Sequence, residues 1–351
     1  MHTCAEERFM SITIKDIARA AGVSHTTVSR ALHNHPGIPA HTAQRIQGIA
    51  VQMGYLPSAV ARGLKTSRSK TLGVILSQID DPFFSEVLQG IEGTLQPQGY
   101  SLLVAASQQD PEKERAIVQD LIERRVDGVI LCAPPFRAEH SHTFQEYRLP
   151  ITVINNQDAE DYQYSIYHDD VYGSRLVTRH LLDLGHQRIA YLGNALAGRS
   201  NRDRLNGFHT EMALAGLSVS QGSVILAANG RPEAGMDCAR HFTELPEPPT
   251  AIACFNDMLA AGLLHGLKQA GWRIPQDCSV TGFDNIEISA YLDPPLTTFH
   301  QPKFHLGAEA ARLMLRLLQS VLQGEALPEP QLIALRGELR LRSSTASPSD
   351  I

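Results

Sequence analysis

Polar side chains that can form specific hydrogen bonds occur at the ends of several predicted strands in the C-terminal four-fifths of the chain. Four of them follow an apolar run or open a helical one: Asp169, Arg204, Asn256 and Asp284. Ligands in open α/β folds bind at the carboxyl ends of strands, so these side chains are candidates for one ligand site. Carboxylate, guanidinium and amide groups suit a polyhydroxylated ligand, because each hydroxyl both donates and accepts. The same residues could instead form ion pairs between lobes or solvated loop charges.

A second polar set lies near the N-terminus, on a predicted helix over about 25–33. Apolar residues at helical spacing predict its buried face: Val28, Ala31 and Leu32. The outward face then carries His25, Thr26, Ser29 and Arg30. A helix that enters the major groove needs such a face, and Arg30 is the best candidate for a bidentate contact with guanine. Ser24 and Thr27, near the helix start, are suited to phosphates. The alternative is a helical cap that packs on another protein surface.

Other motifs are too weak to indicate an activity. The segment 193–200 follows a strand and is similar to a phosphate-binding loop, but Arg199 replaces the lysine that such a loop requires. His168, Asp169 and Asp170 form one local cluster without further spaced histidines, which favours cleft lining over a metal site. No nucleophile, base and orienting group can be assembled, so we expect no enzyme, no cofactor and no metal. Five scattered cysteines without C-x-x-C spacing predict reduced thiols.

The charge distribution divides the chain into a basic head and an acidic body. Eight basic residues and one acid lie between Ser11 and Lys70, whereas the whole chain of 351 residues has a net charge of −6. A basic head suits the phosphate backbone of DNA, which would repel an acidic body. Apolar residues make up 43% of the chain and charged residues 19%, which excludes a largely disordered protein. We find neither a run apolar enough for a membrane span nor an export signal, so we expect a cytoplasmic protein.

The apolar spacing predicts the elements that must position these side chains. In the head, Thr13 and Asp16 form a capping-box pattern at the start of a helix over 14–21. Helices over about 25–33 and 41–53 follow, and Gly22 lies in the first turn, as in a helix-turn-helix. Residues 58–70 are basic and too poor in apolar side chains to fold alone. From Thr71 onward, strands alternate with helices in two runs, which predicts two lobes with parallel sheets covered on both faces.

A series of motifs links the chain to a known family. The chain contains, in order, TIKDIARAAGVSHTTVSRAL, GYLPSAVARGL, DPFF, LGHQRIAYLG, FNDMLAAG, SVTGFDN and PPLTTFHQP. It therefore resembles the lactose-repressor and galactose-repressor family of bacterial transcriptional regulators over about residues 13–342. The resemblance implies an α/β protein with a three-helix helix-turn-helix head, a hinge helix and a two-lobed core like that of periplasmic binding proteins, with parallel sheets flanked by helices.

The resemblance also implies domain boundaries. An unstructured extension spans 1–10, the DNA-binding head 11–57, the hinge 58–70, and the effector-binding and dimerisation body 71–345. Within the body, lobe 1 spans about 71–169 and 299–328. Lobe 2 spans about 170–298 and 329–345.

Individual residues acquire roles from the same resemblance. The base-reading pair of the family falls on His25 and Thr26, and its arginine falls on Arg30. In the hinge, Leu64 matches a leucine that wedges a base step in the minor groove and Ala61 its small partner, while Lys65 is expected to contact phosphate. Ser58 departs from the asparagine common in the family. The residues at effector-binding positions are Phe83, Phe84, Asn155, Asp169, Arg204, Asn256 and Asp284.

We therefore expect a sequence-specific DNA-binding repressor whose operator affinity is controlled by a small ligand between the lobes. A sugar or sugar derivative is the favoured ligand and a purine or nucleoside the alternative. The rival function is a cytoplasmic sugar-binding protein without a regulatory role. Whether the ligand induces or corepresses is open, because this depends on the conformation that it prefers.

The expected partners are palindromic double-stranded operator DNA, the effector and further copies of the chain, as a homodimer or tetramer, with no membrane partner. Two apolar helices are candidates for the symmetric interface. One contains Leu88, Ile91 and Leu95, and the other contains Leu259, Leu263 and Leu264.

Overall fold

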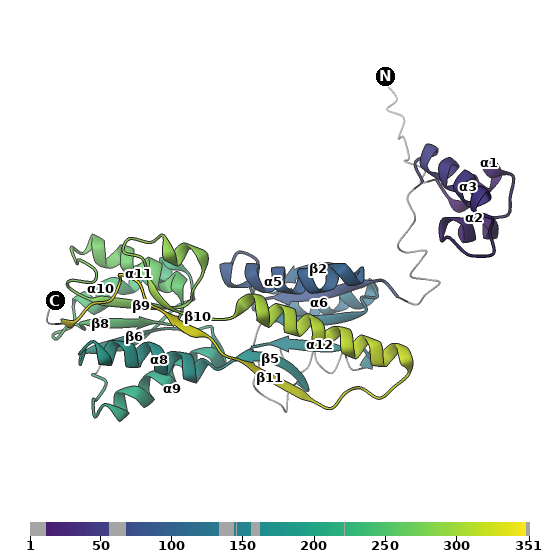
Figure 1. The fold of residues 1–351 in the computed structure, drawn as a ribbon. Helices are drawn as coiled ribbons and strands as arrows, with labels where there is room; N and C mark the ends of the chain where they lie inside the picture. The colour runs from purple at the N-terminus through teal and green to yellow at the C-terminus, as the bar shows by residue number, and fades with distance from the viewer. Residues whose placement is uncertain are drawn as a thin grey trace, which may run out of the picture. The chain divides into compact units, whose positions relative to one another are not determined.

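The computed structural model describes residues 12–55, 68–132, 144, 146–155, 162–220 and 222–348 (Figure 1). The chain divides into two compact units, Met1–Ser69 with the head and Lys70–Ile351 with the body. The extension over 1–10 and the hinge residues Ala61, Leu64 and Lys65 lie outside the described residues. Among the described helices, none is both long and apolar enough to cross a bilayer.

The described part of the head consists of α1 (Ile14–Ala21), α2 (His25–Leu32) and α3 (Ala40–Gln52). At the start of α1, the Thr13 backbone N–H donates to the Asp16 carboxylate at 3.0 Å, as the capping-box pattern predicts. Ser24 caps α2, because its Oγ accepts the Thr27 N–H at 3.1 Å. The inward faces of the three helices form one core that includes Ile17, Val28, Ala31 and Ile46. The helix-turn-helix prediction is confirmed.

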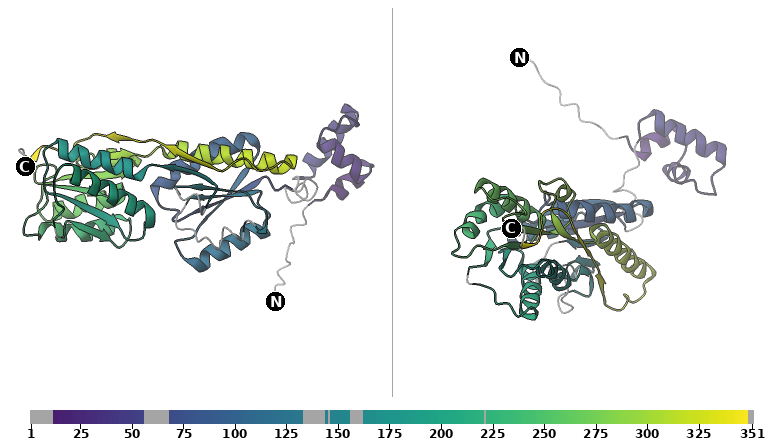
Figure 2. Two further views of the ribbon diagram at one scale, coloured as in Figure 1. Left: turned by 90° about the horizontal axis from the view of Figure 1, so that it is seen from below. Right: turned by 60° about the vertical axis from the view of Figure 1, so that its left-hand side comes forward.

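Lobe 1 is built on a parallel sheet with the strand order β11-β5-β4-β3-β1-β2. The strands are β1 (Thr71–Leu76), β2 (Ser101–Ala106), β3 (Gly128–Cys132), β4 (Ile151–Ile154), β5 (Tyr164–His168) and β11 (Gln331–Leu335). Helices α5 (Pro82–Leu95) and α12 (Lys303–Gln323) pack on one face of this sheet, and α6 (Pro111–Glu123) packs on the other (Figure 2). Alternate residues of β1 enter the two resulting cores, because successive strand side chains point to opposite faces.

Lobe 2 is built on a second sheet, with the order β12-β10-β9-β8-β6-β7. Its strands are β6 (Ile189–Asn194), β7 (Val224–Ala227), β8 (Ala251–Cys254), β9 (Ser279–Asp284), β10 (Thr297–His300) and the antiparallel β12 (Glu338–Arg340). Helices α8 (Asp170–Asp183) and α9 (Gly198–Leu214) cover one face, and α10 (Pro232–Thr243) and α11 (Asp257–Gln269) cover the other. The predicted two-lobed α/β architecture is therefore confirmed.

The chain crosses between the lobes after β5, after β10 and after β11. The predicted lobe boundaries differ from this at the C-terminal end. Residues 299 and 300 belong to β10 in lobe 2, and β11 pairs with β5 in lobe 1 although 329–345 was assigned to lobe 2. Strand β11 is short and only half-buried, so its own apolar spacing does not specify its partner strand. Its position in the sheet is decided by the free edge of β5.

The helices proposed for a symmetric interface bury their apolar residues inside the monomer. Ile91 and Leu95 lie in the core between α5 and α12, while Leu259, Leu263 and Leu264 lie in the core between α10 and α11. Leu88 packs against the first of these cores. These apolar residues therefore pack within the monomer, and an interface on either helix would have to use its other faces, because helical apolar spacing does not tell an internal partner from a second copy of the chain.

Candidate functional site

The helix α2 presents outward the polar side chains that the sequence predicts. His25, Thr26 and Arg30 are exposed, and Thr27 and Ser29 are half-buried. Ser24 is exposed, but its Oγ already accepts the Thr27 N–H and lies 2.9 Å from the Thr27 hydroxyl. The Ser24 side chain therefore fixes the start of α2, where free backbone N–H groups favour an anion such as phosphate.

A cavity of about 280 Å³ lies between the two lobes. Six of the seven predicted effector residues line it: Phe83, Phe84, Asn155, Arg204, Asn256 and Asp284. Lobe 1 contributes the first turn of α5 and the end of β4, and lobe 2 contributes α9, the start of α11 and the end of β9. These places are strand ends and helix starts, so parallel topology brings together residues that are far apart in sequence.

Asp169 is the exception, because it does not line the cavity. It is exposed and caps α8, where its Oδ1 accepts the Tyr172 N–H at 2.9 Å. The next residue, Asp170, is buried and accepts a hydrogen bond from Arg204 Nε at 2.6 Å. His168 Nε2 lies 3.0 Å from the same carboxylate. The predictions that Asp169 and its neighbours line the cleft are wrong, because a capping side chain folds over its own helix while the next residue faces inward.

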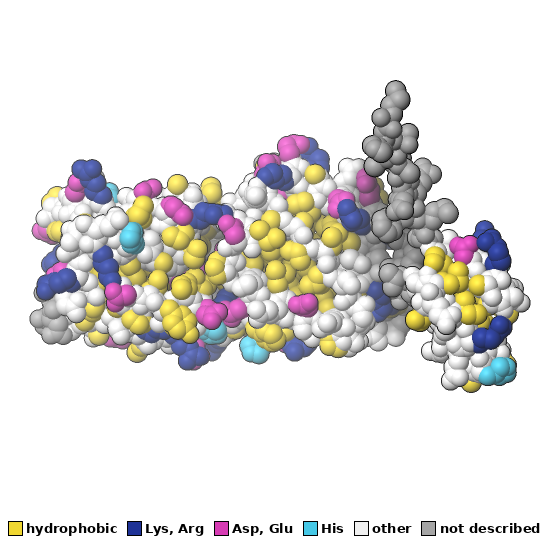
Figure 3. Space-filling model, turned by 90° about the horizontal axis from the view of Figure 1, so that it is seen from above, with side chains coloured by type: hydrophobic (Ala, Val, Ile, Leu, Met, Phe, Trp, Pro, Cys, Tyr) yellow, Lys and Arg dark blue, Asp and Glu magenta, His cyan; other side chains and the backbone are white. Residues whose placement is uncertain are grey.

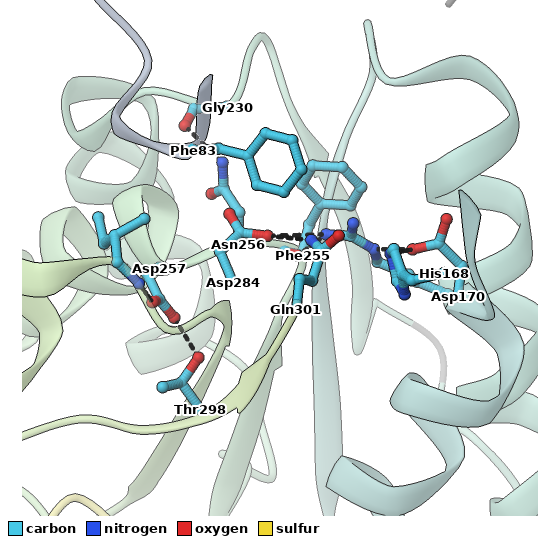
Figure 4. Close-up of polar contacts among 12 residues, drawn as sticks. Phe83, His168, Asp170, Gly230, Phe255, Asn256, Asp257, Asp284, Thr298 and Gln301 are labelled. Carbon is cyan, nitrogen blue, oxygen red and sulfur yellow. Dashed lines mark hydrogen bonds and ion pairs between the residues drawn. The ribbon is translucent and has the colours of Figure 1, made fainter. Parts of the chain in front are cut away.

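Arg204 is held rigidly on the lobe 2 side of the cavity. Its Nη1 donates to the Phe255 carbonyl oxygen at 2.6 Å (Figure 4). Its guanidinium lies 4.3 Å from the Phe255 ring centroid and 3.9 Å from that of Phe283. Burial opposes ionisation of Asp170, but the charge of Arg204 and its hydrogen bond outweigh it and lower the pKa of Asp170. The site therefore contains a buried, charged and preorganised guanidinium.

Asp284 lies beside Arg204 at the end of β9. Its Oδ1 is 3.9 Å from Arg204 Nη1 and accepts a hydrogen bond from Gln301 Nε2 at 2.5 Å (Figure 4). Burial raises the pKa of Asp284 well above its usual range, although Arg204 opposes this shift. The backbone is unusual, with φ 121° at Asp284 and 51° at Asn285. A ligand hydroxyl that donates to this carboxylate would favour its charged form.

Two buried acceptors in the cavity lining have no protein hydrogen-bond partner among the described residues, namely Asn155 Oδ1 and Gln301 Oε1. Asn155 was predicted, whereas sequence reasoning missed Gln301. The sequence pattern that could have identified Gln301 is that of a polar residue directly after a buried strand, here β10. Unpaired buried acceptors are costly, so they favour a ligand that brings donors.

The rim of the cavity carries polar contacts between the lobes that the sequence did not suggest. Arg231, at the start of α10, forms an ion pair with Asp80 before α5 at 2.8 Å. Gln109 Nε2 donates to the Leu196 carbonyl oxygen at 3.2 Å.

Asn256, predicted as an effector ligand, caps α11 and donates to the Gly230 carbonyl oxygen at 3.1 Å within lobe 2. In the segment similar to a phosphate-binding loop, Arg199 pairs with Asp203 at 3.2 Å.

Family models match both parts of the chain. Residues 13–58 match "Bacterial regulatory proteins, lacI family", and residues 178–345 match "Periplasmic binding protein-like domain". Among curated relatives, the PurR transcriptional repressor of Actinobacillus pleuropneumoniae serotype 3 is 35% identical over 95% of this chain and 98% of the relative. The PurR repressor of Vibrio cholerae O1 El Tor is 36% identical over 88% of this chain and 91% of the relative.

Solved structures agree with these matches. The lac repressor dimer bound to operator and the anti-inducer ONPF superposes with a TM-score of 0.84 at 27% identity, covering 96% of this chain and 99% of that one. A regulator of the same family from Enterococcus faecium, with bound ribose, superposes with a TM-score of 0.70 at 29% identity. It covers 79% of this chain and 99% of its own.

Proposed function

The chain belongs to the lacI family of bacterial regulatory proteins, and from the lining of its cleft we propose that a monosaccharide about the size of ribose binds there. The protein is a DNA-binding transcriptional repressor with a small-molecule effector, and it is not an enzyme. The observation that carries the sugar proposal is the set of polar groups around one small cavity. Arg204 supplies donors there, while Asp284, Asn155 and Gln301 supply acceptors.

The size and the walls of the cavity support a monosaccharide. Its volume of about 280 Å³ lies just below the usual range for ligand sites, roughly 300 to 1,000 Å³, and so favours a small ligand. Phe83 and Phe84, whose ring centroids are 5.2 Å apart in an edge-to-face pair, offer an apolar wall to the C–H face of a sugar ring. The bound ribose in the Enterococcus faecium regulator is consistent with this class of ligand.

A purine or nucleoside is the second candidate, favoured by the 35% identity with a PurR repressor over 95% of the chain. A planar base would need aromatic faces for stacking. Phe255 lines the cavity, but the guanidinium of Arg204 lies over its ring at 4.3 Å. Phe83 and Phe84 then remain as the aromatic surface, and their rings form an edge-to-face pair rather than two parallel faces between which a planar base could stack. We therefore rank the sugar first.

For DNA recognition, we propose that the outward face of α2 reads bases in the major groove through His25, Thr26, Ser29 and Arg30. Ser24 and Thr27 would contact phosphates at the start of the same helix. Ala61, Leu64 and Lys65, which lie outside the described residues, keep their expected roles in the hinge.

A homodimer on a palindromic operator is the proposed DNA-binding form. The face of the body that lies uppermost in Figure 1 carries many hydrophobic side chains, as Figure 3 shows. The large apolar residues that are exposed in the described part of the body include Ile79, Met236, Ile288 and Tyr291. The lac repressor structure at 27% identity is that of a dimer bound to operator, which supports the same form here.

Isothermal titration calorimetry of the full chain with D-ribose, D-glucose, hypoxanthine and adenosine tests the class of effector. We expect D-ribose to bind and Asp284→Ala to weaken its binding by about 1.5 to 3 kcal/mol, the scale of a hydrogen bond to a charged group. Asp293→Ala is the control, because Asp293 lies in the same lobe with a side chain that is 96% exposed. Binding of hypoxanthine without any sugar would favour the second candidate, and unchanged affinity in Asp284→Ala would contradict the cleft assignment.

The direction of control follows from a gel-shift titration with operator DNA on the same preparations. By linkage, if the ligand lowers the affinity for operator, the operator lowers the affinity for the ligand by the same factor. An inducer would leave Asp284→Ala bound to operator at ligand concentrations that release the wild type. A corepressor would leave the same variant unbound where the wild type binds.

A further inference from the structure

We propose that Lys303 is a positioning residue of the effector cavity. Its side chain lies outside the cavity lining and holds the wall contributed by lobe 1 in place relative to the wall contributed by lobe 2. Lys303 is the first residue of α12 and does not line the cavity. Its side chain is 0% exposed. The inference rests on the proposed function of the cavity as an effector site.

On the lobe 2 side, Lys303 holds the turn after β9. Its Nζ donates to the carbonyl oxygens of Asp284 at 2.6 Å and Asn285 at 3.0 Å. Both residues have positive φ, and non-glycine residues persist in such conformations only where their surroundings fix them. The ammonium group therefore stabilises the strained turn that places the Asp284 carboxylate in the cavity lining.

On the lobe 1 side, the same Nζ lies 3.2 Å from Glu86 Oε1. Glu86 belongs to α5, and the first turn of that helix carries the aromatic wall formed by Phe83 and Phe84. The single ammonium group thus joins the backbone of one wall to the helix that carries the other. An ammonium has three N–H donors, and these three oxygens match their number.

The burial of Lys303 makes this arrangement sensitive to substitution. A buried charge is tolerated only when it is paired and hydrogen-bonded, and removing one partner leaves the others uncompensated. Without the ammonium, the carbonyls of Asp284 and Asn285 lose a donor and Glu86 loses its cation. We therefore expect both walls to loosen together, although they belong to different lobes. A residue with a role only in the packing of α12 would loosen lobe 1 alone.

Hydrogen exchange in the full chain without effector distinguishes these roles. In Lys303→Met we expect faster exchange both at residues 83–88 in lobe 1 and at residues 284–287 in lobe 2. Lys268→Met is the matched control, because Lys268 forms an ion pair with Asp293 at 2.7 Å on the surface of lobe 2. Faster exchange confined to one lobe, or no faster than in Lys268→Met, would overturn the inference.

Calorimetry with D-ribose provides the second readout. We expect Lys303→Met to bind D-ribose about tenfold more weakly, and Glu86→Gln to stay within about twofold because its amide oxygen still accepts from Lys303. Glu86→Ala removes only the lobe 1 partner and replaces Lys303→Met in the calorimetry if that variant does not fold, and its faster exchange is expected at residues 83–88. If the wild-type protein does not bind D-ribose, the proposed ligand is contradicted. Hydrogen exchange then decides the role of Lys303. Ribose affinity that stays within about twofold in Lys303→Met and Glu86→Ala overturns the inference itself.

Discussion

Arg30 is the side chain of the head with the greatest capacity to distinguish one base from another. It is exposed in the last turn of α2, and its planar guanidinium matches the O6 and N7 acceptors of guanine. We expect Arg30→Ala to lose discrimination at one base position in each half-site, at about 1 to 3 kcal/mol. Arg19→Ala is the control, because Arg19 lies on α1 and pairs with Asp16 at 3.4 Å. Gel shifts against single-base operator variants measure the effect, and an unchanged base preference in Arg30→Ala would remove the recognition-helix assignment.

A second residue-scale prediction concerns Asp257, which is buried beneath the cavity. Its carboxylate accepts hydrogen bonds from the Thr298 hydroxyl at 2.5 Å and the Ile286 N–H at 2.9 Å (Figure 4). Burial nevertheless raises the pKa of Asp257 to about 7, from the usual value of 3.8. Between these values the native protein keeps a proton that the unfolded chain releases. Raising the pH through this window therefore favours the unfolded chain.

Urea unfolding of the wild type and Asp257→Asn at pH values from about 4 to about 7.5 tests this sign. We expect the free energy of unfolding of the wild type to fall relative to that of the variant as the pH rises, with the fall levelling off above the native pKa of about 7. Burial lowers the pKa of His186 and His300, so these groups act in the opposite direction, but they do so in both proteins. A difference between the two proteins that does not vary with pH would contradict the prediction.

At the scale of elements, the contact between α5 and α12 determines how the aromatic wall is held. The two helices approach closely through a reciprocal pair of glycines. A Cβ at Gly90 would fall on the carbonyl oxygen of Phe304, and a Cβ at Gly307 would fall on the carbonyl oxygen of Val87. The backbones therefore touch where any larger residue would separate them, which fixes Phe83 and Glu86 relative to Lys303.

Gly307→Ala is expected to destabilise lobe 1 by about 1 to 3 kcal/mol or more, because the methyl group has no space without moving a helix. Gly93→Ala offers a control on α5 itself, since a Cβ there meets nothing within 4 Å. That control should be neutral or more stable by about 0.5 to 1 kcal/mol, as expected for glycine replacement in a helix. Urea unfolding midpoints measure both variants, and equal stability of the two would contradict the close-contact interpretation.

At the scale of the whole molecule, the charge distribution and the symmetry of DNA binding make a joint prediction. A basic head and a two-fold dimer should give a symmetric footprint on a palindromic operator, with operator affinity falling steeply as salt releases phosphate contacts. We expect a loss of about a hundredfold or more between about 50 and about 200 mM salt. Sedimentation at micromolar concentration and footprinting of the same sample check this. A monomer with an asymmetric footprint would be incompatible with it.

How much of the cavity could be predicted from sequence is clearest at three positions. Asn256 and Asp284 are predictable because each lies at the end of a buried apolar strand, two residues after β8 and at the last residue of β9, and a strand end in a parallel sheet is a local feature of sequence. Gln301 has the same signal after β10 but was missed, because its strand was not recognised. The sequence does not distinguish Asp169 from Asp170, because these adjacent carboxylates differ only in the directions in which their side chains leave the start of α8.

The three helices of the head, the alternation of strands and helices and the two lobes could all be predicted from the amino-acid sequence. These features follow from apolar periodicity and capping residues within short windows. The tertiary structure alone decided that β11 joins lobe 1, that Asp170 holds Arg204, and that Lys303 connects Glu86 to the turn at Asp284. The physical reason is that pairing at a sheet edge and burial of a charge depend on partners distant in sequence, which no local pattern specifies.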